Sequence, residues 1–200
     1  MKFLRPARLR PLLGTAVILA TLLPALASAM ELAGVKVDET AKVANTELKL
    51  NGAGVRIKVI FKVYVAGLYL TEKKSTVQEV LDAKGPRRIA LILLRDVSSA
   101  DFTEAFMHGL NANSDNNEKA RLAGQTVKFG NLFVDTQTLK KGDVVTVDWL
   151  PAVGTQVQLN GKSMSEPLPD AAFYNALLKI WLGESPVDSR LKPQLLGSKA

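Results

Sequence analysis

The chain has 200 residues, no cysteine, one histidine and a formal net charge of +7. The lack of cysteine excludes disulfides, thiolate metal sites and a cysteine nucleophile, so packing alone must stabilise the fold. Without residues 1–29 the net charge falls to +3 and no Lys or Arg run exceeds two, which excludes an electrostatic footprint for nucleic acid.

Residues 1–29 have the three parts of a secretory signal. A basic start is followed by a nearly apolar run, Leu12–Leu26, and by the small residues Ala27-Ser28-Ala29. The apolar run has 15 residues, whereas a helix needs about 20 to cross a bilayer. We therefore expect cleavage after Ala29 and a periplasmic, single-domain protein over residues 30–200 with no stable membrane span; a retained anchor is the alternative.

The first part of the remaining chain is patterned as strands. Residues 31–70 contain alternating apolar positions, and Asn51-Gly52 is a pair typical of a tight turn. Residues 55–70 are rich in β-branched and aromatic side chains, which predicts one or two long strands. A short helix is predicted over 76–83, and the apolar run 88–97 predicts a strand covered on both faces.

The middle of the chain alternates helices with strands. Ser99 is a predicted N-cap, and residues 118–133 form a further, glycine-interrupted helical region. Residues 143–150 and 155–159 alternate in polarity, which predicts a hairpin or meander. The helix after Ser99 carries apolar residues at helical spacing: Phe102, Ala105, Phe106 and Leu110.

The C-terminal part is predicted to be helical. Asp170 caps a helix whose end is expected at a left-handed Gly183, and Ser185-Pro186 has the pattern of another helix start. The order of strands and helices predicts an α+β domain in which an antiparallel sheet is covered mainly on one side.

The sequence contains no metal or cofactor motif. The only histidine, His108, has no carboxylate pair at ligand spacing, and residues 113–118 lack the spaced acids and glycine of a calcium loop. No phosphate-binding loop follows Gly52-Ala53-Gly54, and Gly-x-Ser-x-Gly is absent. We expect no metal and no cofactor.

Arg56 and Tyr64 are candidate binding residues. They lie eight residues apart, so in one uninterrupted strand their side chains share a face. An inward arginine needs an anion or hydrogen-bond acceptors to offset its desolvation, and a ligand carboxylate matches the guanidinium fork. The alternative is an edge-strand arginine on the solvent face.

Two blocks of the chain carry a family resemblance: an N-terminal block, Leu50-Asn51-Gly52-Ala53-Gly54-Val55-Arg56 with Phe61 to Leu70, and a C-terminal block, Ala172 to Val187. The first resembles the N-terminal strands of the chalcone isomerase family, and the second resembles its penultimate helix and the following turn. The resemblance is closest to the bacterial exported branch of that family. The resemblance spans about residues 34–197. It implies a curved antiparallel sheet packed by a helical layer, with the ligand cleft between them.

The resemblance also implies roles for individual residues. In plant chalcone isomerases the Gly-x-Gly-x-Arg arginine, matched by Arg56, stabilises an enolate, helped by a threonine and a tyrosine that organise water. Those positions fall on Tyr64 and Phe102, and a threonine of the penultimate helix falls on Ile180. Lost oxyanion donors severely impair such chemistry. Fatty-acid-binding members pair the arginine with a tyrosine on the carboxylate, as Arg56 and Tyr64 would.

We therefore expect a non-catalytic periplasmic protein that binds a fatty acid or a similar small acidic amphiphile. Arg56 and Tyr64 would hold the head group, with Phe102, Phe106 and Leu110 as tail contacts, and no catalytic residue is assigned. One alternative is an isomerase or lyase of a small phenolic or enone, with Arg56 as the electrophilic group. Another is a ligand-free envelope interaction protein in which Arg56 forms an internal ion pair.

Overall fold

The computed structural model describes residues 29–198, so the expected signal segment lies, except for Ala29, outside the described residues. The strands are β1 (Ala29–Leu32), β2 (Val35–Asp38), β3 (Thr40–Val43), β4 (Thr46–Lys58), β5 (Phe61–Leu70), β6 (Arg87–Leu93), β7 (Val97–Ser98), β8 (Thr138–Leu139), β9 (Val144–Leu150), β10 (Gly154–Leu159) and β11 (Lys162–Ser163). The helices are α1 (Val77–Leu81), α2 (Ser99–Ala112), α3 (Asn116–Gly130), α4 (Ala171–Leu182) and α5 (Leu191–Leu195).

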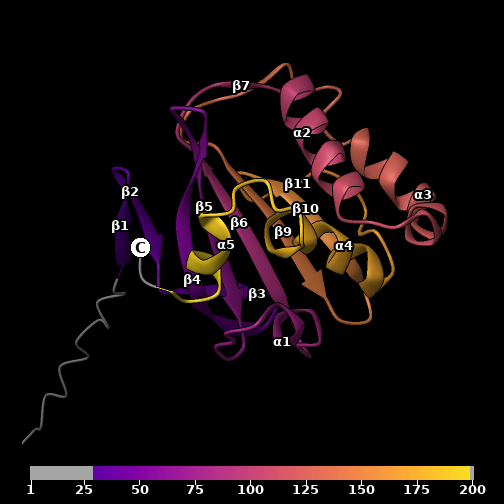
Figure 1. Cartoon of the computed structure of the whole chain (residues 1–200), viewed down its shortest axis with the longest axis horizontal. Coiled ribbons are helices and arrows are strands. Elements are labelled where there is room, and N and C mark those ends of the chain that lie inside the picture. The colour runs from indigo at the N-terminus through magenta and orange to yellow at the C-terminus, as the bar shows by residue number, and fades with distance from the viewer. Residues whose placement is uncertain (1–28, 199–200) are drawn as a thin grey trace, which may run out of the picture.

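Seven strands form one antiparallel sheet in the order β11-β10-β9-β6-β5-β4-β3. Helices α2, α3 and α4 gather on one side of this curved sheet, and α5 lies against β4 (Figure 1). The separate β1–β2 hairpin lies beyond β4 (Figure 1). The predicted α+β class, with a curved antiparallel sheet and a helical layer, is confirmed.

Each face of the sheet has its own hydrophobic cluster. The larger, helix-side cluster joins β5, β6 and β9 to α2, α3, α4 and α5. The smaller cluster lies on the opposite face, under the β1–β2 hairpin. Strand β6 contributes Ile89 and Leu91 to the first and Ala90 and Ile92 to the second, which confirms the prediction of a strand covered on both faces.

A β-bulge in β4 decides which way Arg56 points. The pairing of β4 with β5 shifts between Leu50 and Gly52, so Asn51 is an extra residue. Leu50 faces the smaller cluster, whereas Arg56 pairs with Tyr64 of the helix-side cluster. Residues six apart in a regular strand share a face, so the bulge turns Arg56 toward the helices.

Asn51 and Gly52 therefore do not form the predicted turn, and that prediction is wrong. The buried Asn51 side chain donates to the carbonyls of Lys74 (2.9 Å) and Leu195 (2.8 Å) and accepts from the Lys74 N–H (2.7 Å). A Cβ at Gly52 would collide with the backbone of α5, including the Leu195 carbonyl. The pair permits close packing of the C-terminal helix instead of a chain reversal.

Residues 55–70 form two strands joined by a two-residue turn, Val59–Ile60. The N-cap of α2 is Ser98, one residue before the predicted Ser99, and α3 runs through its interior glycine without a break. The β9–β10 hairpin and the short helix α1 agree with the predictions. No helix in residues 29–198 has the length and apolarity to span a bilayer.

Two predictions for the C-terminal part are wrong. Gly183 has a φ of −70° and is not left-handed; it is required because a Cβ there would collide with the Asn113 side chain and the Lys179 carbonyl. No helix starts at Ser185-Pro186, since α5 begins at Leu191. The intervening segment is held by Asp188, whose carboxylate accepts a hydrogen bond from the Ile57 N–H of β4.

Candidate functional site

The structure brings Arg56 and Tyr64 together by cross-strand pairing. They are direct partners in the β4–β5 register, and directly opposite residues project from the same face of a sheet. The shared face was predicted from an even spacing along one strand, whereas the chain reverses at Val59–Ile60 between them. The guanidinium carbon of Arg56 lies 5.4 Å from the centre of the Tyr64 ring, within cation–π range.

A small cavity of about 70 Å³ lies between this part of the sheet and helices α2 and α4. All four predicted ligand-binding residues line it, whereas Leu110, expected as a tail contact, is buried in the helix-side cluster and does not line it. Its lining comprises Arg56, Lys58, Val63, Tyr64, Val97, Asp101, Phe102, Ala105, Phe106, Ile180, Trp181 and Val187. The wall is mostly apolar, with cationic side chains on the β4 side.

Arg56 has no ion-pair partner among residues 29–198. Its Nε atom is buried and has no hydrogen-bond partner in the described part of the chain. The structure therefore does not support an internal ion pair of Arg56. A buried donor without a partner is unfavourable, and Arg56 as a whole is partly exposed where it lines the cavity, so its guanidinium can meet an acceptor there.

The nearby carboxylate of Asp188 is already occupied. It accepts hydrogen bonds from the Ile57 N–H (3.0 Å) and from Nε of Arg190 (3.1 Å). Burial raises the pKa of Asp188, but these hydrogen bonds and the Arg190 charge outweigh it and hold the pKa below its usual value. Asp188 thus remains an anion that ties the segment before α5 to β4.

Tyr64 is held as a hydrogen-bond donor. The Trp181 indole N–H donates to the Tyr64 hydroxyl oxygen at 2.8 Å. Burial raises the pKa of Tyr64, and the Arg56 charge and the Trp181 hydrogen bond only partly offset this. The hydroxyl therefore keeps its proton at neutral pH, and because its oxygen accepts from Trp181, that proton is available to an acceptor in the cavity.

Three aromatic side chains of the cavity wall, Phe102, Phe106 and Trp181, pack against one another. The ring centroids of Phe102 and Phe106 lie 4.9 Å apart, and Phe106 meets Trp181 edge-on at 5.5 Å. Phe102 and Ile180 bring no hydroxyl, and Tyr64 carries the only one among the described residues of the lining. Sequence reasoning did not identify the role of Trp181 beside Tyr64, since that contact joins residues 117 apart.

An open groove of about 450 Å³ continues from the cavity to the surface. The two share Arg56, Lys58, Asp101, Ala105 and Val187, and the groove adds polar residues from α2 and the 185–187 segment. Arg56 and Lys58 therefore stand where an apolar interior meets a polar surface. This is the arrangement that an amphipathic ligand requires.

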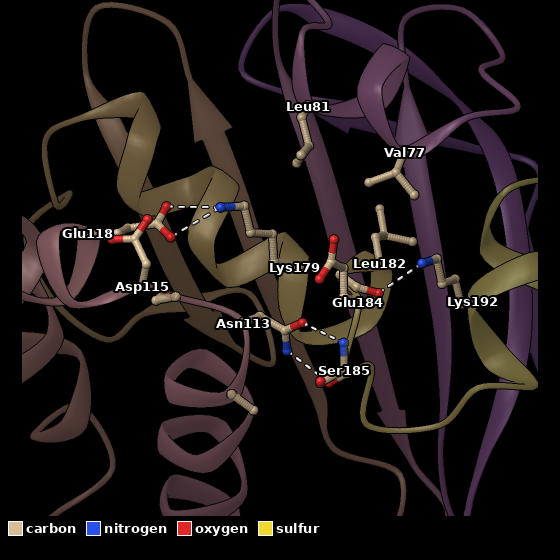
Figure 2. A pocket seen from close by; sticks show the side chains of 13 residues that line it. Val77, Leu81, Asn113, Asp115, Glu118, Lys179, Leu182, Glu184, Ser185 and Lys192 are labelled. Carbon is tan, nitrogen blue, oxygen red and sulfur yellow. Dashed lines mark hydrogen bonds and ion pairs between the residues drawn. The ribbon is translucent and has the colours of Figure 1, made fainter.

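A larger groove of about 590 Å³ lies near the ends of α2, α4 and α5 (Figure 2). Its cationic side chains are paired: Lys179 with Glu118 at 3.0 Å, and Lys192 with the Gly183 carbonyl at 2.8 Å. Asn113 joins Gly109 of α2 to Ser185 (Figure 2 shows the Ser185 contacts). These contacts fasten the helices together and leave little for a charged ligand.

The fold and the cavity define a class of small α+β proteins with an internal site between a curved antiparallel sheet and a helical layer. A model of the chalcone isomerase-like family matches residues 29–197. The chain belongs to the chalcone isomerase-like family, as its sequence blocks predicted.

The fold is similar to a crystal structure of a fatty-acid binding protein from Arabidopsis thaliana. The TM-score is 0.68 at 16% identity, and the match covers 84% of this chain and 96% of the plant protein. At this identity the similarity establishes the fold alone. No match was found among curated protein sequences.

Proposed function

We propose that the protein is a non-catalytic binding protein for a small acidic amphiphile such as a fatty acid. The observation that carries the proposal is the buried, unpartnered Nε of Arg56, beside the Tyr64 hydroxyl at the boundary of an apolar cavity. A carboxylate there would accept from the guanidinium and from the hydroxyl. The structural similarity to a plant fatty-acid binding protein supports this proposal.

The size of the cavity restricts the ligand. Pockets for small molecules usually measure about 300–1,000 Å³, and the inner cavity has about 70 Å³. A short apolar group fits it directly, whereas a long alkyl tail requires Phe102 and Phe106 to change rotamer or must lie in the outer groove. Rotamer changes of this kind are common on binding. We therefore expect octanoate to bind more readily than laurate.

The missing hydroxyls support binding over isomerisation. A developing enolate would find Arg56 and Tyr64, but Phe102 and Ile180 offer no hydrogen bond to order a water molecule. Removing one oxyanion donor typically costs about 3 kcal/mol in the transition state. The apolar wall instead suits a ligand tail.

We also propose that the protein acts in the periplasm and belongs to the exported bacterial branch of the family. The support is the pattern of residues 1–29, with its basic start, apolar run and Ala-x-Ala ending. Amino-terminal sequencing of the protein from secreting cells tests this directly. A mature start at Met30 is expected, and an intact leader would contradict the proposal.

The binding proposal is tested by titrating octanoate while following heat and the intrinsic fluorescence, to which Trp149 and Trp181 both contribute. Charge-assisted hydrogen bonds contribute about 2 kcal/mol, so Arg56→Gln should weaken binding about thirtyfold. Arg121→Gln, on the exposed face of α3, is the matched control and should bind as the wild type does. The methyl ester of octanoate, which has no carboxylate, should bind poorly to the wild type and to both variants. Equal affinity of Arg56→Gln and wild type for octanoate would overturn the proposal.

A further inference from the structure

The turn between β4 and β5 exposes an unusual number of apolar side chains. Val59 is 86% exposed, Ile60 78% and Phe61 53%. These three consecutive residues are flanked by Lys58 and Lys62, which are also exposed. We call Lys58–Lys62 the hairpin tip; it projects from one end of the sheet, near the segment that leads to β7 (Figure 1).

The backbone of the hairpin tip is strained in a way that its sequence could easily have avoided. Val59 has a φ of +60°, at the first position of a two-residue turn where glycine is favoured. A left-handed conformation is unfavourable for L-residues and a true outlier for a β-branched one. Strain retained at an exposed position points to a function of the side chain, and here that side chain is apolar and faces water.

Cationic groups surround the hairpin tip. Lys58 and Lys62 flank it, and the guanidinium of Arg95 lies 4.9 Å from the centre of the Phe61 ring. The carboxylate next to Arg95, Asp96, is hydrogen-bonded by the side chain of Lys140 and the N–H of Lys141. Asp101 and Glu104 line the groove that Lys58 also lines and partly offset its charge, whereas Lys62 and Arg95 have no salt-bridge partner among residues 29–198.

Apolar side chains at a projecting turn with cations at their base match an anionic lipid surface. The apolar groups enter the acyl boundary, while lysine and arginine remain at the level of the head groups. Each cation near an anionic membrane strengthens attachment by about fivefold. A folded protein partner would need a concave apolar site, for which the small, protruding tip offers little contact area.

We propose that the hairpin tip is a membrane-docking element that inserts Val59, Ile60 and Phe61 into an anionic lipid bilayer. Since Lys58 belongs both to the tip and to the mouth of the Arg56 cavity, docking places that mouth at the bilayer surface. An acidic amphiphile could then pass between membrane and cavity without crossing water. The docking itself does not depend on the proposed ligand.

Cosedimentation with vesicles tests the inference. The wild type and all variants are purified from secreting cells, so that their N-termini are processed in the same way. The vesicles are phosphatidylcholine with and without phosphatidylglycerol. Ile60→Ser with Phe61→Ser should bind anionic vesicles at least tenfold more weakly, and Lys62→Gln with Arg95→Gln should lose most of the preference for phosphatidylglycerol. Val127→Ser with Val134→Ser, exposed valines elsewhere, is the matched control. Equal binding of tip variants and control would overturn the proposal.

A tryptophan at the tip reports insertion at that site even if another segment also contacts lipid. Measured as the difference from the wild type, which retains Trp149 and Trp181, the emission added by Ile60→Trp should shift to the blue with anionic vesicles and be quenched by brominated acyl chains, while that added by Val127→Trp should not. An unshifted, unquenched Ile60→Trp signal contradicts the proposal. The proposal is also contradicted if the serine variants lose self-association of the protein but bind vesicles as the wild type does.

Val59→Gly separates docking from folding because its two effects have opposite signs. Glycine relieves the left-handed strain at some entropic cost, so the ratio of folded to unfolded protein should rise about twofold to fivefold. Vesicle binding should fall, whereas octanoate binding in solution should not change. A variant that is more stable and binds vesicles as well as the wild type would show that the exposed valine has no docking role.

Discussion

Asn51 connects the fold to the site, and its replacement gives a sharp test of that connection. The side chain is 3% exposed and makes three hydrogen bonds of 2.7–2.9 Å to the backbone of Lys74 and Leu195. Asn51→Ala leaves two carbonyls and one N–H without this partner in a largely buried place. Each such loss costs about 1–2 kcal/mol, so the three together predict a destabilisation of about 3–6 kcal/mol.

Urea unfolding at neutral pH measures this change. The midpoint should fall while the slope stays constant, since the exposed area on unfolding hardly changes. Asn117→Ala, at an exposed position of α3, is the control and should stay within about 0.5 kcal/mol of the wild type. If Asn51→Ala lowers the free energy of unfolding by less than about 1 kcal/mol, the three hydrogen bonds do not stabilise the fold as expected. The claim that this side chain fastens the β4 bulge to the C-terminal helix would then be wrong.

Three further predictions concern the surroundings of the cavity. Gly54→Ala would place a Cβ 2.8 Å from a methyl group of α5, and urea unfolding should show a loss of about 1–3 kcal/mol. Asp188→Asn should destabilise the protein by about 1 kcal/mol at neutral pH. Because the pKa of Asp188 is lowered in the folded protein, the ionised carboxylate stabilises the fold above about pH 4. The difference in unfolding free energy between variant and wild type should therefore disappear as the pH falls below that value. Trp181→Phe removes the donor to Tyr64, and octanoate titration should show binding weakened about fivefold to tenfold, with unchanged affinity arguing against a positioning role.

The strand and helix order could be predicted because apolar periodicity reports burial locally. Alternation identified the β9–β10 hairpin, and the helical spacing of Phe102 and Phe106 placed both on the inner face of α2. The family blocks fixed the overall architecture. Local caps could be found to within one residue, as Ser98 in place of Ser99 shows.

The errors arise where distant contacts decide local conformation. Asn51-Gly52 is a turn signal when read alone, but the packing of a helix more than 130 residues later makes it a bulge. Gly183 is small because Asn113 approaches it, not because it is left-handed. Neither contact can be predicted from the residues next to it in the sequence.

The four residues named from the sequence line one cavity, but the geometry that brings them together was not predicted. Arg56 and Tyr64 share a face through strand pairing, and the bulge and the turn that produce this arrangement could not be predicted from their spacing. The volume of the cavity depends on how Phe102, Phe106 and Trp181 pack together, which no pattern in a single sequence specifies. The restriction on ligand size therefore comes from the structure alone.

Native mass spectrometry of the protein purified from its own compartment, beside Arg56→Ala, tests the central claim most directly. The account predicts a bound acidic amphiphile of modest size in the wild type and an empty Arg56→Ala protein. An empty wild type that also ignores added octanoate and laurate would contradict it.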